Sequence, residues 1–430
     1  MRKRPDAHWL KSLGPGLLFA AAAVGVSHLV QSTRAGAGYG LALVGVVIAA
    51  NVIKYPAFRF GPHYAAATGM SLLEGYRRRG RWALLLYGML TLATMFTIQA
   101  GVTVVTAGLA IATFKLPVGP VVTSGLLIAA CGLMLAAGHY RVLDRVTKVL
   151  VAVLTVSTLA ATILVLPRVD WSSLAIVPLS IEWNATTIVF VAALIGWMPS
   201  AIDVSVWHSL WTLARGQDTQ HRPTLKEATL DFHIGYVGTA ALALCFVLMG
   251  AGVLFGSNVP IPDQAGAFAS LVIRLYTETL GSWAGPIVSV SAFAVMLSTT
   301  LTVLDGFPRA LSTFEARLRR PEDPAVFELD EARGRRVYWA SLVVLGLVAV
   351  LVLALFLQSL KAMIDVATTL SFLTAPLLSL LNHRAVLGDE VPASSRPRLW
   401  LVAMSVVCIV LQSVFAIGYL WIRYHGDSST

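Results

Sequence analysis

The sequence predicts an all-α polytopic membrane protein of eleven transmembrane helices, and three observations lead to this prediction. Hydrophobic residues make up 57% of the 430 residues and charged residues only 13%, whereas an ordinary soluble domain carries roughly 25% charged residues. The apolar residues form runs long enough to cross a hydrocarbon core of about 30 Å at about 1.5 Å per helical residue. Two of these runs are interrupted at their middles, at residues 25–28 and 196–200.

The expected helices follow one another along the chain and leave no second domain, so we expect one transmembrane domain over residues 1–430. The first opens with Gly14, Pro15 and Gly16. Each later run is separated from the one before by a polar connection. The eleven runs lie near residues 14–33, 39–58, 82–112, 117–137, 146–167, 187–214, 229–255, 282–304, 337–358, 362–382 and 399–422.

The basic residues predict the orientation, because loops rich in Lys and Arg stay in the cytoplasm. Of the 32 basic residues, 25 fall in the N-terminal tail and in alternate loops. We therefore expect an inner (plasma) membrane protein whose N-terminus is cytoplasmic and whose C-terminus lies outside. Lys54 stands alone inside the second run, where snorkelling or helix pairing is the default expectation. The six basic residues expected outside are Arg34, Lys115, Arg168, Arg274, Lys361 and Arg423.

Composition also indicates the partners and excludes some functions. The net charge of +10 is distributed by topology rather than gathered on one module, so it indicates anionic lipid and not nucleic acid. The three cysteines have no metal-ligand spacing, and no phosphate loop, His-Glu-x-x-His or Gly-x-Ser-x-Gly motif occurs. We expect no enzymatic activity, no cofactor and no obligate protein partner.

The two interrupted runs predict a binding site. Gly25 and Gly196 lie 171 residues apart, at corresponding positions of the first and sixth runs. An unpaired peptide group in hydrocarbon costs several kcal/mol, so a break must be repaired by neighbours or by a ligand. Paired breaks are typical of transporters, whose substrates bind at them.

Runs one to five and six to ten form two sets of five, over residues 14–167 and 187–382. Five crossings reverse the direction of entry, so the second set must be inverted relative to the first. The run at 399–422 is an additional helix. This arrangement resembles the five-plus-five inverted-repeat (LeuT-type) transporter fold with broken helices 1 and 6.

Within that fold the chain resembles the Nramp family of proton-coupled divalent-metal transporters over nearly its full length. The resemblance rests on residues 14–16 (Gly-Pro-Gly), 35–40 (Ala-Gly-Ala-Gly-Tyr-Gly), 198–199 (Met-Pro) and 208–209 (His-Ser). It implies a transported divalent cation such as Mn, Fe or Mg. Family members carry Asp-Pro-Gly-Asn at the first break and Met-Pro-His at the second, whereas this chain has Gly-Val-Ser-His and Met-Pro-Ser. It also has no acidic residue between Glu74 and Asp144, where the family places helix-three carboxylates.

The candidate substrate-binding or ion-binding residues are Gly25, His28, Trp197, Met198 and Asp203. A metal would be held by the imidazole, thioether and carboxylate of His28, Met198 and Asp203, with carbonyl oxygens near Gly25 and Trp197. Each has a structural alternative: a hydrogen bond within the break for His28, packing for Met198, and capping of a half-helix for Asp203.

Three further residues are candidates for coupling or gating: Asp365, Thr369 and His208. A carboxylate at mid-membrane costs about 2.5 to 3.5 kcal/mol and usually has a partner or a task. For Asp365 the structural alternative is a salt bridge to Lys54 or Arg34.

We therefore predict a secondary transporter for a divalent metal cation that alternates access around a site between helices 1 and 6. Two alternatives stay open. The same fold would carry a small organic or anionic solute, because half-helix N-termini favour anions. A transporter-like sensor would bind its ligand without moving it.

Overall fold

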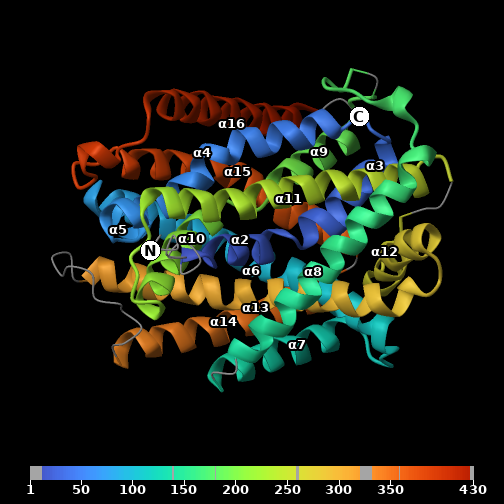
Figure 1. The fold of residues 1–430 in the computed structure, drawn as a ribbon, viewed down its shortest axis with the longest axis horizontal. Coiled ribbons are helices and arrows are strands. Elements are labelled where there is room, and N and C mark those ends of the chain that lie inside the picture. Colours follow the sequence, from blue (N-terminus) through green and yellow to red (C-terminus); the bar gives the residue numbers. More distant parts are fainter. Residues whose placement is uncertain are drawn as a thin grey trace, which may run out of the picture.

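The computed structural model describes residues 12–137, 140–179, 181–257, 261–319, 332–357 and 359–426, and these residues form helices and no strand. Most of the long helices run side by side along one direction (Figure 1). The helices are α2 (Pro15–Ala23), η1 (Ser27–Ser32), α3 (Thr33–Tyr39), α4 (Val44–Thr68), α5 (Leu72–Arg78), α6 (Arg81–Phe114), α7 (Pro120–Ala136), α8 (Tyr140–Val165), η2 (Leu166–Arg168), η3 (Trp171–Ser173), α9 (Ala185–Trp197), α10 (Val204–Asp218), α11 (Leu225–Val253), α12 (Ala265–Leu280), α13 (Ala284–Arg319), α14 (Ala332–Phe356), α15 (Leu360–Val386), η5 (Ala393–Ser395) and α16 (Leu399–Gly426).

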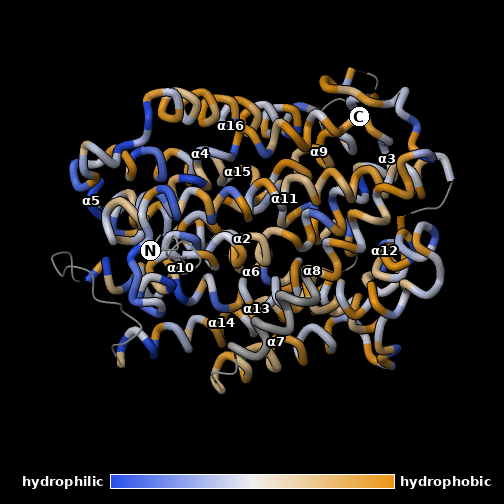
Figure 2. Tube along the Cα trace, viewed as in Figure 1, coloured by the Kyte–Doolittle hydropathy of each residue, from blue (hydrophilic) through white to orange (hydrophobic). Residues whose placement is uncertain are grey.

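Six described helices are long and apolar enough to cross a membrane, and the bent pair formed by α2 with η1 and α3 raises this to seven. The six are α6, α11, α13, α14, α15 and α16. Figure 2 shows apolar residues along the middle of the bundle and hydrophilic residues concentrated at its left end. Every predicted run overlaps a helix, while the count of eleven spans stays a prediction.

Several helices differ from the sequence prediction, and α13 continues to Arg319 although its run was expected to end near residue 304. The second run was expected to end near residue 58, but α4 continues to Thr68 through two prolines. The short α5 and the amphipathic α12 were not predicted at all. A search for long apolar runs overlooks such helices because only one side of each is apolar.

The helix α11 packs against both halves of the first broken helix, α2 and α3. Glycines make each crossing close: a Cβ at Gly16 would overlap the carbonyl of Asp231, and a Cβ at Gly36 would overlap that of Val247. Small residues at helix crossings let backbones approach in a membrane, where the hydrophobic effect adds little between helices. α11 therefore acts as the support on which the broken helix lies.

Asp231 of α11 also fixes the start of α2. Its carboxylate accepts hydrogen bonds from the backbone N–H of Gly14, at 3.0 Å, and of Gly16, at 2.5 Å. Pro15 between them has no N–H to satisfy. A carboxylate at a helix N-terminus also lies at the positive end of the helix dipole, so this cap stabilises α2 in two ways.

Candidate functional site

The first break lies at residues 24–26, between α2 and the π-helical turn η1, and the chain bends there by 46°. Gly25 packs against Thr299 of α13, and a Cβ on Gly25 would lie 3.0 Å from the Thr299 methyl group. The Thr299 hydroxyl donates to the carbonyl of Ala21 over 2.8 Å. A side chain of α13 thus satisfies a backbone group that the break leaves without its helical partner.

The second break covers residues 198–203, between the end of α9 and the start of α10. The sequence placed it at 196–200, but Gly196 still belongs to α9. A Cβ at Gly196 would overlap the carbonyl of Thr368, so this glycine allows α9 to pack closely on α15. The two breaks meet where the hydroxyl of Ser27 lies 3.2 Å from the carbonyl of Pro199.

Lys54 of α4 reaches into the second break. Its side chain is buried, and Nζ lies 2.7 Å from the carbonyl oxygens of both Ile195 and Gly196 and 3.2 Å from that of Ser200. Of the two alternatives expected for Lys54, snorkelling is wrong, because the ammonium contacts backbone carbonyls inside the bundle, and the structure shows the pairing of α4 with α9. The carbonyls that the sequence assigned to an ion near Trp197 are in contact with an ammonium group of the protein.

A cavity of about 30 Å³ lies between the two breaks, with room for roughly two water molecules. Three hydroxyl groups and a mostly apolar surface line it, and none of the lining side chains is ionisable. Of the predicted site residues, only Trp197 lines this cavity, and its indole N–H donates to Ser371 Oγ over 2.8 Å. The lining residues are Ala22, Ala23, Val26, Ser27, Ile98, Val102, Trp197, Ser200, Ala201, Val204, Trp207, Thr299 and Val303.

His28 is fully buried, and both of its ring nitrogens contact the protein. Nε2 lies 2.9 Å from the carbonyl of Thr239, and Nδ1 lies 2.7 Å from the hydroxyl of Ser27. A carbonyl only accepts, so Nε2 carries the proton and Nδ1 accepts from Ser27. This is the hydrogen-bonding alternative foreseen for His28.

Asp203 and Met198 occupy the two ends of the second break. Asp203 is the N-cap residue of α10, is buried, and has the hydroxyl of Thr91 at 3.5 Å from its carboxylate. Met198 is buried and lies outside the cavity lining. Within the described ranges, no group of three or more His, Cys, Asp or Glu side chains is arranged to hold a metal. Coordination of a metal by His28, Met198 and Asp203 stays a prediction.

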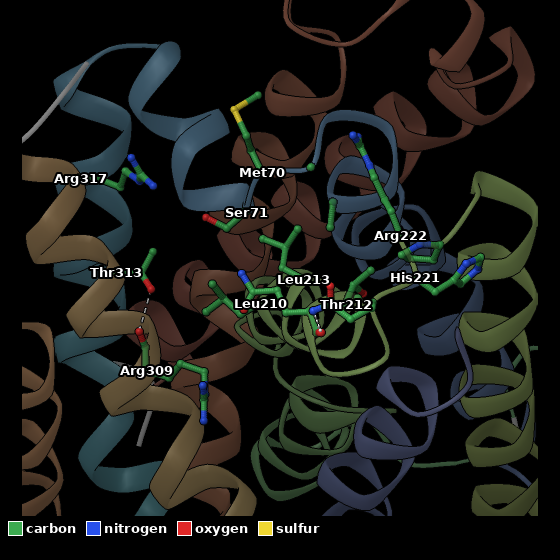
Figure 3. A pocket seen from close by; sticks show the side chains of 16 residues that line it. Met70, Ser71, Leu210, Thr212, Leu213, His221, Arg222, Arg309, Thr313 and Arg317 are labelled. Carbon is green, nitrogen blue, oxygen red and sulfur yellow. Dashed lines mark hydrogen bonds between the residues drawn. The ribbon is translucent and has the colours of Figure 1, made fainter. Parts of the chain in front are cut away.

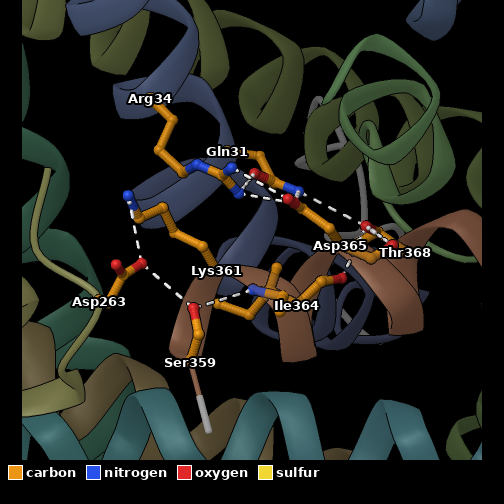
Figure 4. Close-up of polar contacts among 9 residues, drawn as sticks. Gln31, Arg34, Asp263, Ser359, Lys361, Ile364, Asp365 and Thr368 are labelled. Carbon is orange, nitrogen blue, oxygen red and sulfur yellow. Dashed lines mark hydrogen bonds and ion pairs between the residues drawn. The ribbon is translucent and has the colours of Figure 1, made fainter. Parts of the chain in front are cut away.

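Asp365 of α15 forms a partly buried ion pair with Arg34 of α3 (Figure 4). The guanidinium donates to both carboxylate oxygens, over 2.6 and 3.1 Å, and also to Gln31. The expected salt-bridge alternative for Asp365 therefore exists, with Arg34 and not Lys54.

Two further polar residues, Lys361 and Thr369, lie near Asp365 in the sequence of α15. A hydrogen bond from Lys361 lowers the pKa of the Asp263 carboxyl. The hydroxyl of Thr369 is buried and has no hydrogen-bond partner.

His208 of α10 lies in a cluster of aromatic rings beside α2 and α11. Its ring stacks on Phe19 at 5.8 Å and contacts Phe232 and Trp211. Nε2 is 3.9 Å from a carboxylate oxygen of Asp231, and neither ring nitrogen has a hydrogen-bond partner. His208 is therefore next to the cap of α2 and is not a cavity residue.

A second, larger cavity of about 420 Å³ opens among α4, α10 and α13. Figure 3 shows Leu210 and Leu213 of α10 facing Arg309 and Thr313 of α13 across it. We call this cavity the vestibule. Three arginines, Arg222, Arg309 and Arg317, are among its lining residues.

Two aromatic rings separate the small cavity from the vestibule. In the sequences of both α10 and α13, the residues that line the small cavity precede the residues that line the vestibule. Between the two sets, the rings of Trp207 and Phe307 meet edge to face, with centroids 4.7 Å apart. Gly306 allows this packing, since a Cβ there would lie 2.7 Å from the Trp207 ring.

Sequence reasoning missed several residues that build this site: Lys54, Ser27, Thr299, Gln31 and Asp231. Lys54 carried the strongest signal, because it is the lone charge inside an apolar run. Ser27 lay within the predicted break but was not singled out. Thr299 and Asp231 act through contacts across more than 200 residues, which no local pattern indicates.

Comparison with known proteins gives a consistent picture. A family model described as natural resistance-associated macrophage protein-like (Nramp) matches residues 16–418. The chain is 34% identical to an uncharacterized protein of Pasteurella multocida, PM0681, over 395 residues, or 91% of this chain and 88% of that protein. It is 26% identical to the divalent metal cation transporter MntH of Verminephrobacter eiseniae, over 63% of this chain and 62% of that one.

Solved structures resemble the fold at low sequence identity. A mutant of the Eremococcus coleocola manganese transporter superposes with a TM-score of 0.71 at 15% identity, covering 100% of this chain and 91% of that one. MhsT in complex with L-phenylalanine superposes with a TM-score of 0.58 at 15% identity, covering 95% and 97%. These two similarities concern the fold.

Proposed function

This chain belongs to the natural resistance-associated macrophage protein-like (Nramp) family, and from that membership we propose that it is a secondary membrane transporter for a divalent metal cation. The observation that carries the proposal is the cavity between two helix breaks, whose lining residues are all buried. Interrupted helices place free peptide groups and helix ends around one mid-membrane point, which is where such carriers bind their cargo. The names of two similar proteins, a manganese transporter and a divalent metal cation transporter, support the choice of cargo.

The proposed carrier alternates access between two closures on either side of the cavity. The outer closure is the ion pair of Arg34 with Asp365, which ties α3 to α15. The inner closure is the contact of Trp207 with Phe307, which blocks the way to the vestibule. Opening one closure at a time would expose the cavity to one side of the membrane. This assigns gating to Asp365, and leaves Thr369 and His208 as neighbours of the moving helices.

The proposed topology has eleven spans in two inverted sets of five plus one. In this scheme the first span comprises α2, η1 and α3, the sixth comprises α9 and α10, and α16 is the additional helix. α2 begins at one end of the bundle and α16 ends at the other (Figure 1), as an odd number of crossings requires. We place the vestibule in the cytoplasm, because Arg222, Arg309 and Arg317 line it and belong to basic segments expected on that side.

The proposed cation contacts are at the second break. Met198 and Asp203 bound it and supply a thioether and a carboxylate, Trp197 ends α9 beside it, and Gly25 is the proposed contact from the first break. His28 would join only by giving up its contacts with Ser27 and Thr239. Metal binding at this point therefore requires a rearrangement of the closed cavity.

Uptake of Mn²⁺ into proteoliposomes tests the proposal. We expect uptake above that of empty liposomes, and a loss of about tenfold or more for Asp203→Ala and Met198→Ala, equivalent to roughly 1.4 kcal/mol. Asp263→Ala removes an exposed carboxylate and serves as the control. Uptake that is unchanged in both site variants would contradict the proposed contacts, and the absence of uptake in the wild type would contradict metal transport.

A small anionic or organic solute is the second candidate cargo. This candidate is supported by the ammonium group of Lys54, which lies next to the small cavity, and by the absence of any carboxylate from the lining of that cavity. Calorimetry with Mn²⁺ and with amino acids separates the two cargoes. Binding of either one without uptake would indicate the sensor instead of a carrier.

A further inference from the structure

Lys54 is a buried cation held by backbone carbonyls alone. It is 1% exposed, and its three ammonium protons match three acceptors, the carbonyl oxygens of Ile195, Gly196 and Ser200. Among the described residues, no ion pair includes Lys54. The positive charge is therefore balanced by peptide dipoles rather than by a carboxylate.

The three carbonyls are those that a broken helix leaves without partners. Ile195 and Gly196 lie in the last turn of α9, where the helix dipole is negative, and Ser200 lies in the break itself. Carbonyl oxygens at the C-terminal end of a half-helix are the ligands with which a transporter holds a coupling cation such as Na⁺. At this break an ammonium on α4 occupies that position.

We propose that the Lys54 ammonium is a tethered cation that takes the place of a bound inorganic coupling ion at the second helix break. The end of α9 then keeps its shape without Na⁺ or K⁺. Because the carbonyls of Ile195 and Gly196 already contact Lys54, they supply no ligand to the cargo proposed at Met198 and Asp203. This inference concerns the coupling ion and goes beyond the proposed function, which concerns the cargo.

Thermal unfolding of the full-length protein in detergent, with NaCl or choline chloride at equal ionic strength, tests the inference. Choline is too large to enter the break. We expect the same unfolding midpoint for the wild type in both salts. Lys54→Ala should have a midpoint several degrees lower in choline chloride, because three buried carbonyls lose their donor. Na⁺ or methylammonium should recover part of this loss, since either fits the vacated space.

Two other variants complete the experiment. Lys54→Met keeps the length of the side chain without the charge, so we expect it to be destabilised and not recovered by Na⁺. Lys226→Ala removes an exposed lysine and should change neither the midpoint nor the response to salt.

Several results would overturn the inference. They are a wild type that is stabilised by Na⁺ over choline, a Lys54→Met variant as stable as the wild type, and a folded Lys54→Ala variant on which neither cation has an effect. If Lys54→Ala does not fold, the measurements on the wild type and on Lys54→Met still test the inference. None of these readouts involves uptake, so a failed metal-transport assay leaves this test unaffected.

Discussion

At the two breaks, individual side chains supply hydrogen bonds that continuous helices would make within their own backbone. Thr299 donates a hydrogen bond to the end of α2, and Lys54 donates to the end of α9. Each comes from a different part of the bundle. The breaks are therefore part of the packed structure and not locally unfolded segments.

Asp231 has the same role at the start of α2, and its replacement gives a prediction at this scale. Asp231→Ala removes the acceptor of two buried N–H groups, so we expect a loss of about 1–3 kcal/mol in the free energy of unfolding. Asp231→Asn keeps one acceptor oxygen and should lose less. Thermal unfolding in detergent measures both losses. Asp389→Ala, at an exposed carboxylate, is the control, and an equal effect in the control would contradict the capping role.

The sequence predicted where the backbone is broken but not how it is repaired. Gly25 marked the first break because a glycine inside an apolar run weakens a helix. Lys54 was visible as a lone charge, yet its partners are 141 to 146 residues away, and only the packing of α4 on α9 and α10 brings them together. His28 was a candidate because an imidazole can bind a metal. Its ring nitrogens instead contact the neighbouring Ser27 and the Thr239 carbonyl of α11, and no local pattern indicates the second contact.

At the scale of helices, the sequence predicted the apolar ones and missed those that lie at the ends of the bundle. The hydropathy pattern found each long helix because lipid demands a continuous apolar run. α12 escaped because Arg274 and Glu278 break its apolar pattern. Gly196 was assigned to the break because a glycine in a membrane helix can either weaken the helix or allow close packing. Here it permits close packing, and the helix ends one residue later.

The outer closure gives a prediction about helices. In Asp365→Ala, α3 and α15 lose their ion pair, and the charge of Arg34 loses its partner. We expect a cysteine at Thr368→Cys, beside this pair, to react several-fold faster with a membrane-impermeant thiol reagent applied from outside. The three native cysteines are buried, so their background reaction should be slow.

A matched control is available on the same side of the bundle. Glu278→Ala breaks an exposed ion pair with Arg274 and should leave the labelling rate of Thr368→Cys unchanged. An unchanged rate in Asp365→Ala as well would mean that the ion pair stabilises α3 without closing the outer path.

For the whole molecule, we propose that the cavity and the vestibule belong to one state in which both closures are shut. Arg34 and Asp365 are paired and do not line the small cavity, and no residue lines both the cavity and the vestibule. The composition predicted a membrane protein, and Figure 2 shows an apolar middle of the bundle with hydrophilic residues concentrated at one end. The composition did not predict this state, because closure depends on side chains from helices that are distant in the sequence.

A prediction for the whole molecule concerns Trp207 as the barrier between the two cavities. Its ring is 2% exposed and separates a cavity of about 30 Å³ from one of about 420 Å³. Trp207→Ala should join the two spaces, so a cysteine at Ser200→Cys should react about tenfold faster or more in inside-out vesicles, where the reagent enters through the vestibule. Trp207→Phe keeps a ring in contact with Phe307 and should have a smaller effect.

Removing a buried tryptophan also costs stability, about 3–5 kcal/mol for substitution by alanine. The unfolding midpoint of each variant must therefore be measured together with its labelling rate. Trp421→Ala, at an exposed tryptophan of α16, is the control for loss of an indole ring, and it should leave the labelling rate unchanged. If Trp207→Ala stays folded and Ser200→Cys remains as slow as in the wild type, Trp207 does not close the path. The cavity would then reach the cytoplasm by a route other than the vestibule.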